Sequence, residues 1–185
     1  NHEQAVSPEK SKTRMLFKKC RSESQGCLQI DGQVYWLVSY EVPCFGKKSH
    51  QCADLVGLTK AGGLVVFECK LKNSYAPITS VIEGLDYPSC LTAEPNFSQL
   101  QREFQEWQQT PNQIVPVGFE DVRPQSMACH EVIVLANSEY FDHYRMNPTK
   151  SRNTQRGTGW SDFAAACAIN SHSPRIRFAV TEFTE

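Results

Sequence analysis

The sequence predicts an α/β domain with a central mixed β-sheet flanked by helices. Short apolar runs bounded by turn residues fill the first part of the chain and indicate β-hairpins. Further along, segments with helical periodicity alternate with another apolar run at residues 131–136, which is typical of an α/β arrangement. The 185 residues suffice for one domain with a substantial core, so residues 1–185 are expected to form a single domain.

Composition excludes some classes of protein. Hydrophobic residues make up 40% of the chain and charged residues 21%, as in an ordinary globular protein. No apolar run approaches the roughly 20 residues that cross a bilayer, so no membrane partner is expected. The net charge is −1, so any attraction to nucleic acid must come from a local basic patch.

The chain holds eight cysteines, an even number that permits a disulfide framework. Their scatter, without any C-x-x-C spacing, argues against such a framework and against a zinc site. We therefore expect reduced thiols and an intracellular, cytoplasmic protein. Cys69 and Cys167 lie in apolar runs and are expected to be buried.

The polar residues 1–12 are expected to be flexible. Ser7 and Pro8 form a helix start, with the serine as cap and the proline in the first turn, and this helix extends to Cys20. Asp31-Gly32 is a turn signal that separates a strand at 27–30 from a longer strand at 34–42.

A second hairpin, at residues 53–70, organises the rest of the chain. Two apolar runs, 53–58 and 64–70, flank a loop that ends in Gly-Gly, and the second run is apolar on both faces, as in a central strand. If the hairpin is centred on Ala61, paired residues have numbers that sum to 122. Asp54 then faces Glu68, with their Cβ atoms roughly 4.5–5.5 Å apart, and Lys70 shares that face.

Two facing carboxylates repel each other, and a divalent cation between them would convert the repulsion into binding. A register slip of one residue would place them on opposite faces and remove the site. The alternative is an accidental charge cluster at the end of a strand.

The remaining elements follow from periodicity and caps. A helix is expected through 78–85, with its end left open by Gly84 and Pro88. Residues 96–109 form the clearest helix, with Asn96 as its cap. Its apolar stripe is expected to be core rather than a base-stacking platform and consists of Phe97, Leu100, Phe104 and Trp107.

The last third of the chain predicts a strand at 131–136, a short helix capped by Asn137, a small helix from Ser161 and a final strand at 176–180. Residues 146–159 are polar and basic. They are expected to form a mobile loop, which either closes on nucleic acid or is an ordinary surface loop.

The spacing of Asp54 and Glu68-Cys69-Lys70 resembles the signature of the PD-(D/E)xK nuclease superfamily. In that family the aspartate ends one hairpin strand and the E-x-K motif lies on the next. The resemblance covers roughly residues 40–87, and it departs from the family pattern at Ala53, where the name-giving motif has proline. It implies a restriction-endonuclease-like core.

The resemblance also implies an enzyme, a nuclease that hydrolyses phosphodiester bonds, most often in DNA, in repair, restriction or anti-phage defence. Asp54 and Glu68 would bind Mg²⁺ or Mn²⁺, and the backbone carbonyl of Cys69 would add a ligand. Lys70 would orient or activate the attacking water, or stabilise the developing charge. Many relatives dimerise, so a homodimer or a larger complex is one expectation.

Two further positions follow from the family pattern. Glu41 is the candidate for an upstream acid that adds a metal or water ligand, with Glu9 and Glu23 as weaker alternatives. Exonuclease-like members carry Gln-x-x-x-Tyr on the helix after E-x-K. Tyr87 matches the tyrosine, and Glu83 stands where the glutamine would be. Glu83 adds a negative charge near a polyanionic substrate, adds a metal-facing carboxylate, or shows that the motif is not carried over.

Basic side chains are the candidates for contacts with the phosphate backbone, although each also suits a solvated loop. They are Lys47, Lys48, Lys72, Arg152 and Arg156. Two other functions stay open. One is a non-catalytic nucleic-acid-binding module on the same fold, and the other is a scaffold domain with an incidental acidic cluster, which would bind no metal.

Overall fold

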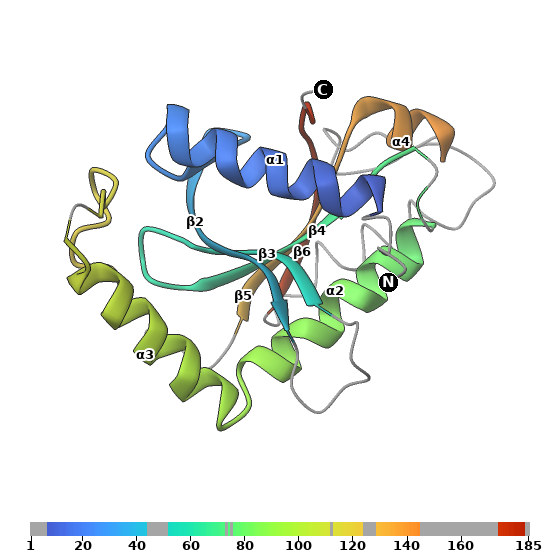
Figure 1. The fold of residues 1–185 in the computed structure, drawn as a ribbon. Helices are drawn as coiled ribbons and strands as arrows, with labels where there is room; N and C mark the ends of the chain where they lie inside the picture. The colour runs from blue at the N-terminus through green and yellow to red at the C-terminus, as the bar shows by residue number, and fades with distance from the viewer. Residues whose placement is uncertain are drawn as a thin grey trace, which may run out of the picture.

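The computed structural model describes residues 7–43, 52–72, 74, 76–111, 113–123, 129–144 and 174–183. These residues form a six-stranded mixed sheet with α1 on one face and α2 and α3 on the other (Figure 1). The predicted class, α/β with a mixed sheet flanked by helices, is confirmed. The elements are α1 (Pro8–Glu23), β1 (Cys27–Ile30), β2 (Gln33–Pro43), β3 (Cys52–Leu58), β4 (Leu64–Lys70), α2 (Pro77–Leu91), α3 (Asn96–Gln109), β5 (Cys129–Ala136), α4 (Ser138–His143) and β6 (Arg175–Val180).

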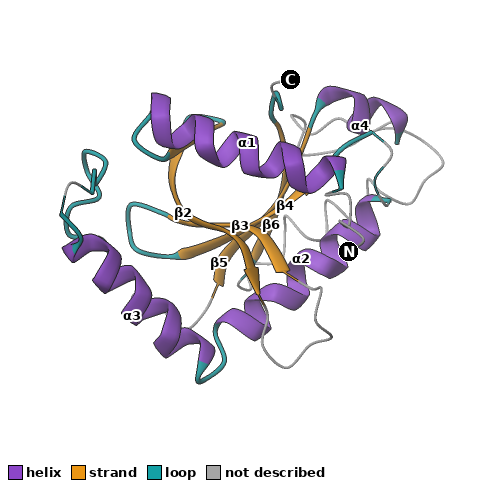
Figure 2. Ribbon diagram, viewed as in Figure 1, coloured by secondary structure: helices purple, strands orange, loops and turns teal. Residues whose placement is uncertain are grey.

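The strands lie in the sheet in chain order, from β1 to β6. The first four form an antiparallel meander, whereas β4, β5 and β6 run parallel. The connection from β4 to β5 contains α2 and α3, which cover the face opposite α1 (Figure 2). No helix in the described segments is both long and apolar enough to cross a membrane.

The predicted register of the 53–70 hairpin is confirmed. Leu58 pairs with Leu64, Val56 with Val66 and Leu55 with Phe67, so the numbers of paired residues sum to 122. Every residue of β4 is buried between β3 and β5, as expected of a central strand. Because the strands pair in this register, Asp54 and Glu68 lie on the same face of the sheet.

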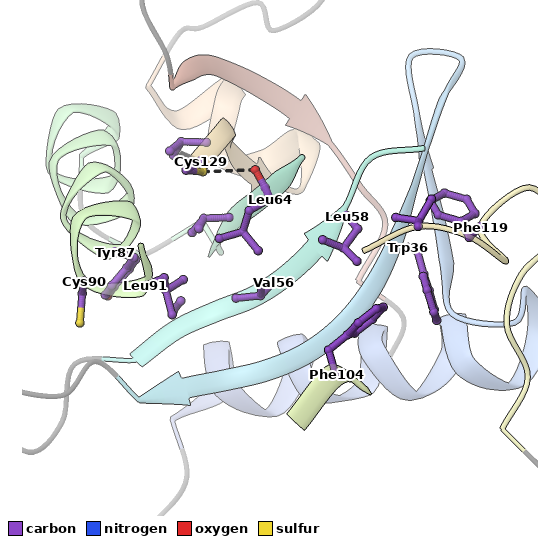
Figure 3. Close-up of a cluster of buried hydrophobic side chains, with 14 residues drawn as sticks. Trp36, Val56, Leu58, Leu64, Tyr87, Cys90, Leu91, Phe104, Phe119 and Cys129 are labelled. Atoms are coloured by element: carbon purple, nitrogen blue, oxygen red, sulfur yellow. Dashed lines mark hydrogen bonds between the residues drawn. The ribbon is translucent and has the colours of Figure 1, made fainter. Parts of the chain in front are cut away.

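The two faces of the sheet bury separate apolar clusters. On the α1 face, Leu16 and Cys20 pack against Leu55 and Phe67. On the other face, the ring of Trp36 lies beside that of Phe104, with their centroids 5.3 Å apart (Figure 3). The centroid of the Trp107 ring is 5.2 Å from that of Trp36. The stripe of the predicted helix at 96–109 is therefore core, as expected.

The sheet curls around its α1 face. Strands β2 and β5 are separated by β3 and β4, yet the Tyr35 hydroxyl lies 2.6 Å from Oε2 of Glu131. Arg177 of β6 reaches Asp31, in the turn between β1 and β2, at 2.9 Å. These polar contacts join strands from the two halves of the sheet at the end opposite the carboxyl end of β4.

The predicted start of α1 is confirmed, whereas the predictions for residues 8–12 and for the cap of α3 are wrong. Ser7 caps α1 by accepting a hydrogen bond from the Lys10 amide at 3.2 Å. Since α1 begins at Pro8, the segment 1–12 is helical over its second half rather than flexible. Asn96 does not cap α3, because its amide group donates to the Cys90 carbonyl at 2.9 Å and thereby joins α3 to the end of α2.

The other predicted elements agree with the structure except at their ends. Helix α2 continues through Pro88 to Leu91, and β5 begins two residues before the predicted strand. Asn137 caps α4 by accepting from the Tyr140 amide at 3.1 Å. The expected basic loop at 146–159, the small helix from Ser161 and Cys167 lie outside the described residues.

Candidate active site

Strands β3 and β4 bring Asp54 beside Glu68 at the carboxyl end of β4. The register that pairs Leu55 with Phe67 places the next position, Asp54, opposite Glu68. Oδ2 of Asp54 accepts a hydrogen bond from the Cys69 backbone amide at 2.8 Å, which holds the aspartate against β4. The structure thus brings together the two carboxylates that the sequence paired.

Lys70 is the centre of a cluster of carboxylates. Its Nζ lies 2.6 Å from Oε1 of Glu68, 3.1 Å from Oε2 of Glu83 and 3.5 Å from Oε1 of Glu9. The lysine side chain is only 4% exposed. Side chains of α1, β4 and α2 therefore converge on one buried ammonium group.

The cluster has more negative than positive groups. Four carboxylates, on Glu9, Asp54, Glu68 and Glu83, surround the single ammonium of Lys70 among the described residues. Burial, assisted by the charges of Glu9 and Glu83, raises the pKa of Asp54 to about 7. Burial and the neighbouring Asp54 charge likewise raise the pKa of Glu68 well above its ordinary value. An added cation would relieve this repulsion.

The charge on Lys70 is secured by its neighbours. Burial lowers the pKa of Lys70, but the charges of Glu68, Glu9 and Glu83 outweigh burial and raise that pKa above its ordinary value. Lys70 is therefore an ammonium group at neutral pH.

Glu68 has one oxygen without a partner. Its side chain is 3% exposed, and Oε2 makes no hydrogen bond within the described part of the chain. Leaving a buried carboxylate oxygen unpaired is costly unless a ligand satisfies it. Carboxylate oxygens are the donors that Mg²⁺ and Mn²⁺ prefer, so Asp54 and Glu68 fit the metal that the sequence implied.

The ligand set is incomplete when side chains alone are counted. No group of three or more His, Cys, Asp or Glu side chains in the described segments is arranged to hold a metal. Mg²⁺ is commonly held by one or two carboxylates and keeps several waters, so a pair such as Asp54 and Glu68 is compatible with it.

Helix α2 brings both of its predicted residues to the cluster. Gly84 permits close approach to the sheet, because a Cβ atom there would lie 2.6 Å from Cγ1 of Val132. Glu83 consequently reaches Lys70. Tyr87 is buried, and burial together with the charges of Glu68 and Asp54 raises its pKa.

Glu9 joins the cluster from α1, and sequence reasoning ranked it below Glu41. Besides its contact with Lys70, Glu9 accepts a hydrogen bond from the Ser74 hydroxyl, which in turn accepts from the Leu71 amide at 2.8 Å. The helix start at Ser7-Pro8 places an acid in the first turn of α1, but no local pattern indicates that this turn lies beside β4.

Glu41, the expected upstream metal or water ligand, does not contact Lys70, and its Oε1 is buried without a hydrogen-bond partner among the described residues. It lies on β2 at the position facing Asp54, between the pairs Tyr40–Leu55 and Val42–Ala53, and has a φ of 49°. Its Oε2 pairs with Arg14 of α1 at 3.1 Å. Glu9, not Glu41, is the acid that contacts Lys70, and Glu23 lies at the opposite end of α1.

One of the predicted phosphate-contacting residues lies near this site. Lys72 follows β4 by two residues and is exposed, with its Nζ 4.0 Å from Oε2 of Glu139. The other four, Lys47, Lys48, Arg152 and Arg156, lie outside the described residues.

Searches of protein-family models, curated proteins and solved structures find no match to this chain.

Proposed function

We propose that this chain is a metal-dependent nuclease that hydrolyses phosphodiester bonds, with DNA as the favoured substrate, on a restriction-endonuclease-like core. The unpartnered, buried oxygen of Glu68 beside Asp54 and Lys70 carries the proposal. The resemblance to PD-(D/E)xK nucleases supports it, because Asp54 and Glu68-Cys69-Lys70 lie on adjacent paired strands and a helix with Glu83 and Tyr87 follows.

In this proposal Asp54 and Glu68 hold Mg²⁺ or Mn²⁺, with the Cys69 carbonyl as a further ligand. A metal held by these residues would lower the pKa of a bound water and would neutralise charge on the reacting phosphate. Lys70, which its neighbours keep protonated, contributes a positive charge and hydrogen-bond donors that orient the water or stabilise the developing charge. In this proposal Glu9, rather than Glu41, is the upstream acid, and Glu83 positions the ammonium group of Lys70.

The proposal includes an intracellular location, a biological role and an assembly state. Six cysteines of the described segments form no disulfide, and the proposed setting is an intracellular one in which they stay reduced. Repair, restriction and anti-phage defence are the proposed roles. A homodimer or a larger complex is the proposed assembly for cutting both strands.

DNA cleavage tests this function. Circular and linear DNA are incubated with Mg²⁺, Mn²⁺ or EDTA and either the wild-type protein, Glu68→Gln or Glu131→Gln. Glu131 is the matched control, because it is a buried carboxylate on the neighbouring β5 that lies outside the cluster. We expect metal-dependent cutting by the wild type and by Glu131→Gln, and a loss on the order of 10²–10³-fold in Glu68→Gln.

The other outcomes contradict the nuclease function. DNA binding without cutting under either metal would identify a non-catalytic nucleic-acid-binding module. The absence of both binding and cutting would leave the acidic cluster as part of a scaffold domain. Equal cutting by the wild type and Glu68→Gln would place the activity elsewhere in the chain.

A further inference from the structure

A cavity of about 1090 Å³ with a mixed polar and apolar lining adjoins the carboxylate cluster. The first turn of α1, the segment after β4, the start of α4 and the segment after β6 surround it. Glu9 and Ser74 line this cavity, and Glu9 also contacts Lys70, so the cavity and the cluster share a wall. A ligand that enters the cavity therefore lies next to the proposed reaction centre.

Basic and aromatic side chains line the same cavity. Lys12 of α1 and Lys72 after β4 supply ammonium groups, and Tyr144 and Phe183 supply half-buried rings. The Tyr144 hydroxyl donates to the Ser74 carbonyl at 3.0 Å, and its ring lies 5.1 Å from that of Tyr140, so the tyrosine is held in place. Ammonium groups contact phosphates and aromatic rings stack on bases, a combination that suits single-stranded nucleic acid.

Three carboxylates, on Glu9, Glu139 and Glu182, line the cavity beside the two ammonium groups, and Glu139 lies 4.0 Å from Lys72. The side chains of Lys72 and Glu139 are 55% and 62% exposed, and an ion pair between exposed groups is worth little. A phosphate can therefore take the place of Glu139 beside Lys72 at small cost.

We propose that this cavity binds one unpaired nucleotide beside the scissile phosphate. The substrate is then nucleic acid with a single-stranded end or segment at the point of cleavage, rather than continuous duplex. In a duplex each base is already stacked and paired, and extracting it costs a few kcal/mol, whereas a single strand presents its bases freely. This inference rests on the proposed nuclease function for its location and deepens it by naming the substrate class.

Binding measured apart from cleavage tests the inference. Glu68→Gln protein in Mg²⁺ is titrated into a fluorescent single-stranded oligonucleotide and into a blunt duplex of the same sequence, and anisotropy is recorded. We expect the single strand to bind at least about tenfold more tightly. Adding Tyr144→Leu should weaken single-strand binding about 5- to 150-fold, as for the loss of one stacked base.

Matched variants separate stacking from other effects. Tyr144→Phe keeps the ring and should retain single-strand affinity. Lys72→Ala, at an exposed position that should not disturb folding, should lower the salt dependence of binding by about one phosphate contact. Lys60→Ala is the control, since Lys60 is exposed on the β3–β4 turn, at the other end of β4 from the cluster.

The outcomes distinguish this inference from the proposed function. Equal affinity for duplex and single strand, or unchanged affinity in both Tyr144→Leu and Lys72→Ala, overturns the nucleotide cavity even if wild-type protein cuts duplex DNA. Single-strand binding that depends on Tyr144 and Lys72, in a wild-type protein that cuts no DNA under either metal, supports the cavity while contradicting the nuclease.

Discussion

The two oxygens of Glu68 have opposite surroundings. Oε1 lies 2.6 Å from the Lys70 ammonium, whereas Oε2 is buried without a partner in the described part of the chain. Folded proteins satisfy nearly all of their buried polar atoms, and exceptions concentrate where a ligand or a reaction needs them. A cation is the simplest ligand for this oxygen, because it would also reduce the repulsion from Asp54.

Asp54 makes the stability of the metal-free protein depend on pH. Its pKa in the folded chain is about 7. An unfolded aspartate has a pKa of about 3.9, so the folded chain binds more protons between these values and stability falls as pH rises through that window. We expect Asp54→Asn to remove this part of the pH dependence and to melt at or above the wild-type temperature at pH 8 in EDTA.

Thermal melts in EDTA from pH 5 to 8 measure the effect. Asp121→Asn, at an exposed position, is the control and should follow the wild type. A steep pH dependence that persists unchanged in Asp54→Asn would show that this aspartate is ionised throughout, contrary to the burial and repulsion seen here.

At the level of elements, the closeness of α2 to β5 positions Glu83 and Tyr87. Gly84 lies between them in sequence, and any Cβ there would collide with Val132. We expect Gly84→Ala to displace α2 at a cost of about 1–3 kcal/mol, which a gain of about 1 kcal/mol from helix propensity offsets only in part. The melting temperature should fall roughly 2–4 °C per net kcal/mol.

A second substitution shows whether the collision is the cause. Val132→Ala removes the methyl group that Gly84→Ala would meet, so the double variant should lose less stability than the two single effects combined. Ser89→Ala, at an exposed position of the same helix, should leave the melting temperature unchanged. Full stability of Gly84→Ala alone would contradict the close contact.

At the scale of the whole molecule, local and long-range features were not equally predictable. The position of the turn between two neighbouring strands sets the register that places Asp54 opposite Glu68, and the structure has that register. The contact of Glu9 with Lys70 depends on how α1 crosses the sheet, and the contact of Tyr35 with Glu131 depends on the curl. Neither contact is indicated by a periodic pattern in the sequence.

Two side chains, Asn96 and Glu41, have partners that the sequence did not predict, for a related reason. Asn96 has the residue type and position of a helix cap, but a tertiary hydrogen bond to Cys90 competes for its amide. Glu41 has the expected position beside Asp54 in the sheet, but Arg14 of the neighbouring helix takes its carboxylate. In both cases, the partner that prevails is distant in sequence or comes from another element.

Binding of Mn²⁺, measured by isothermal titration calorimetry, tests most directly whether the carboxylate cluster is a metal site. Wild-type protein and Glu131→Gln should bind Mn²⁺ with the same affinity, and Glu68→Gln should bind it at least about tenfold more weakly. A wild-type protein that binds no Mn²⁺, or a Glu68→Gln variant that binds it as well as the wild type, would contradict the account.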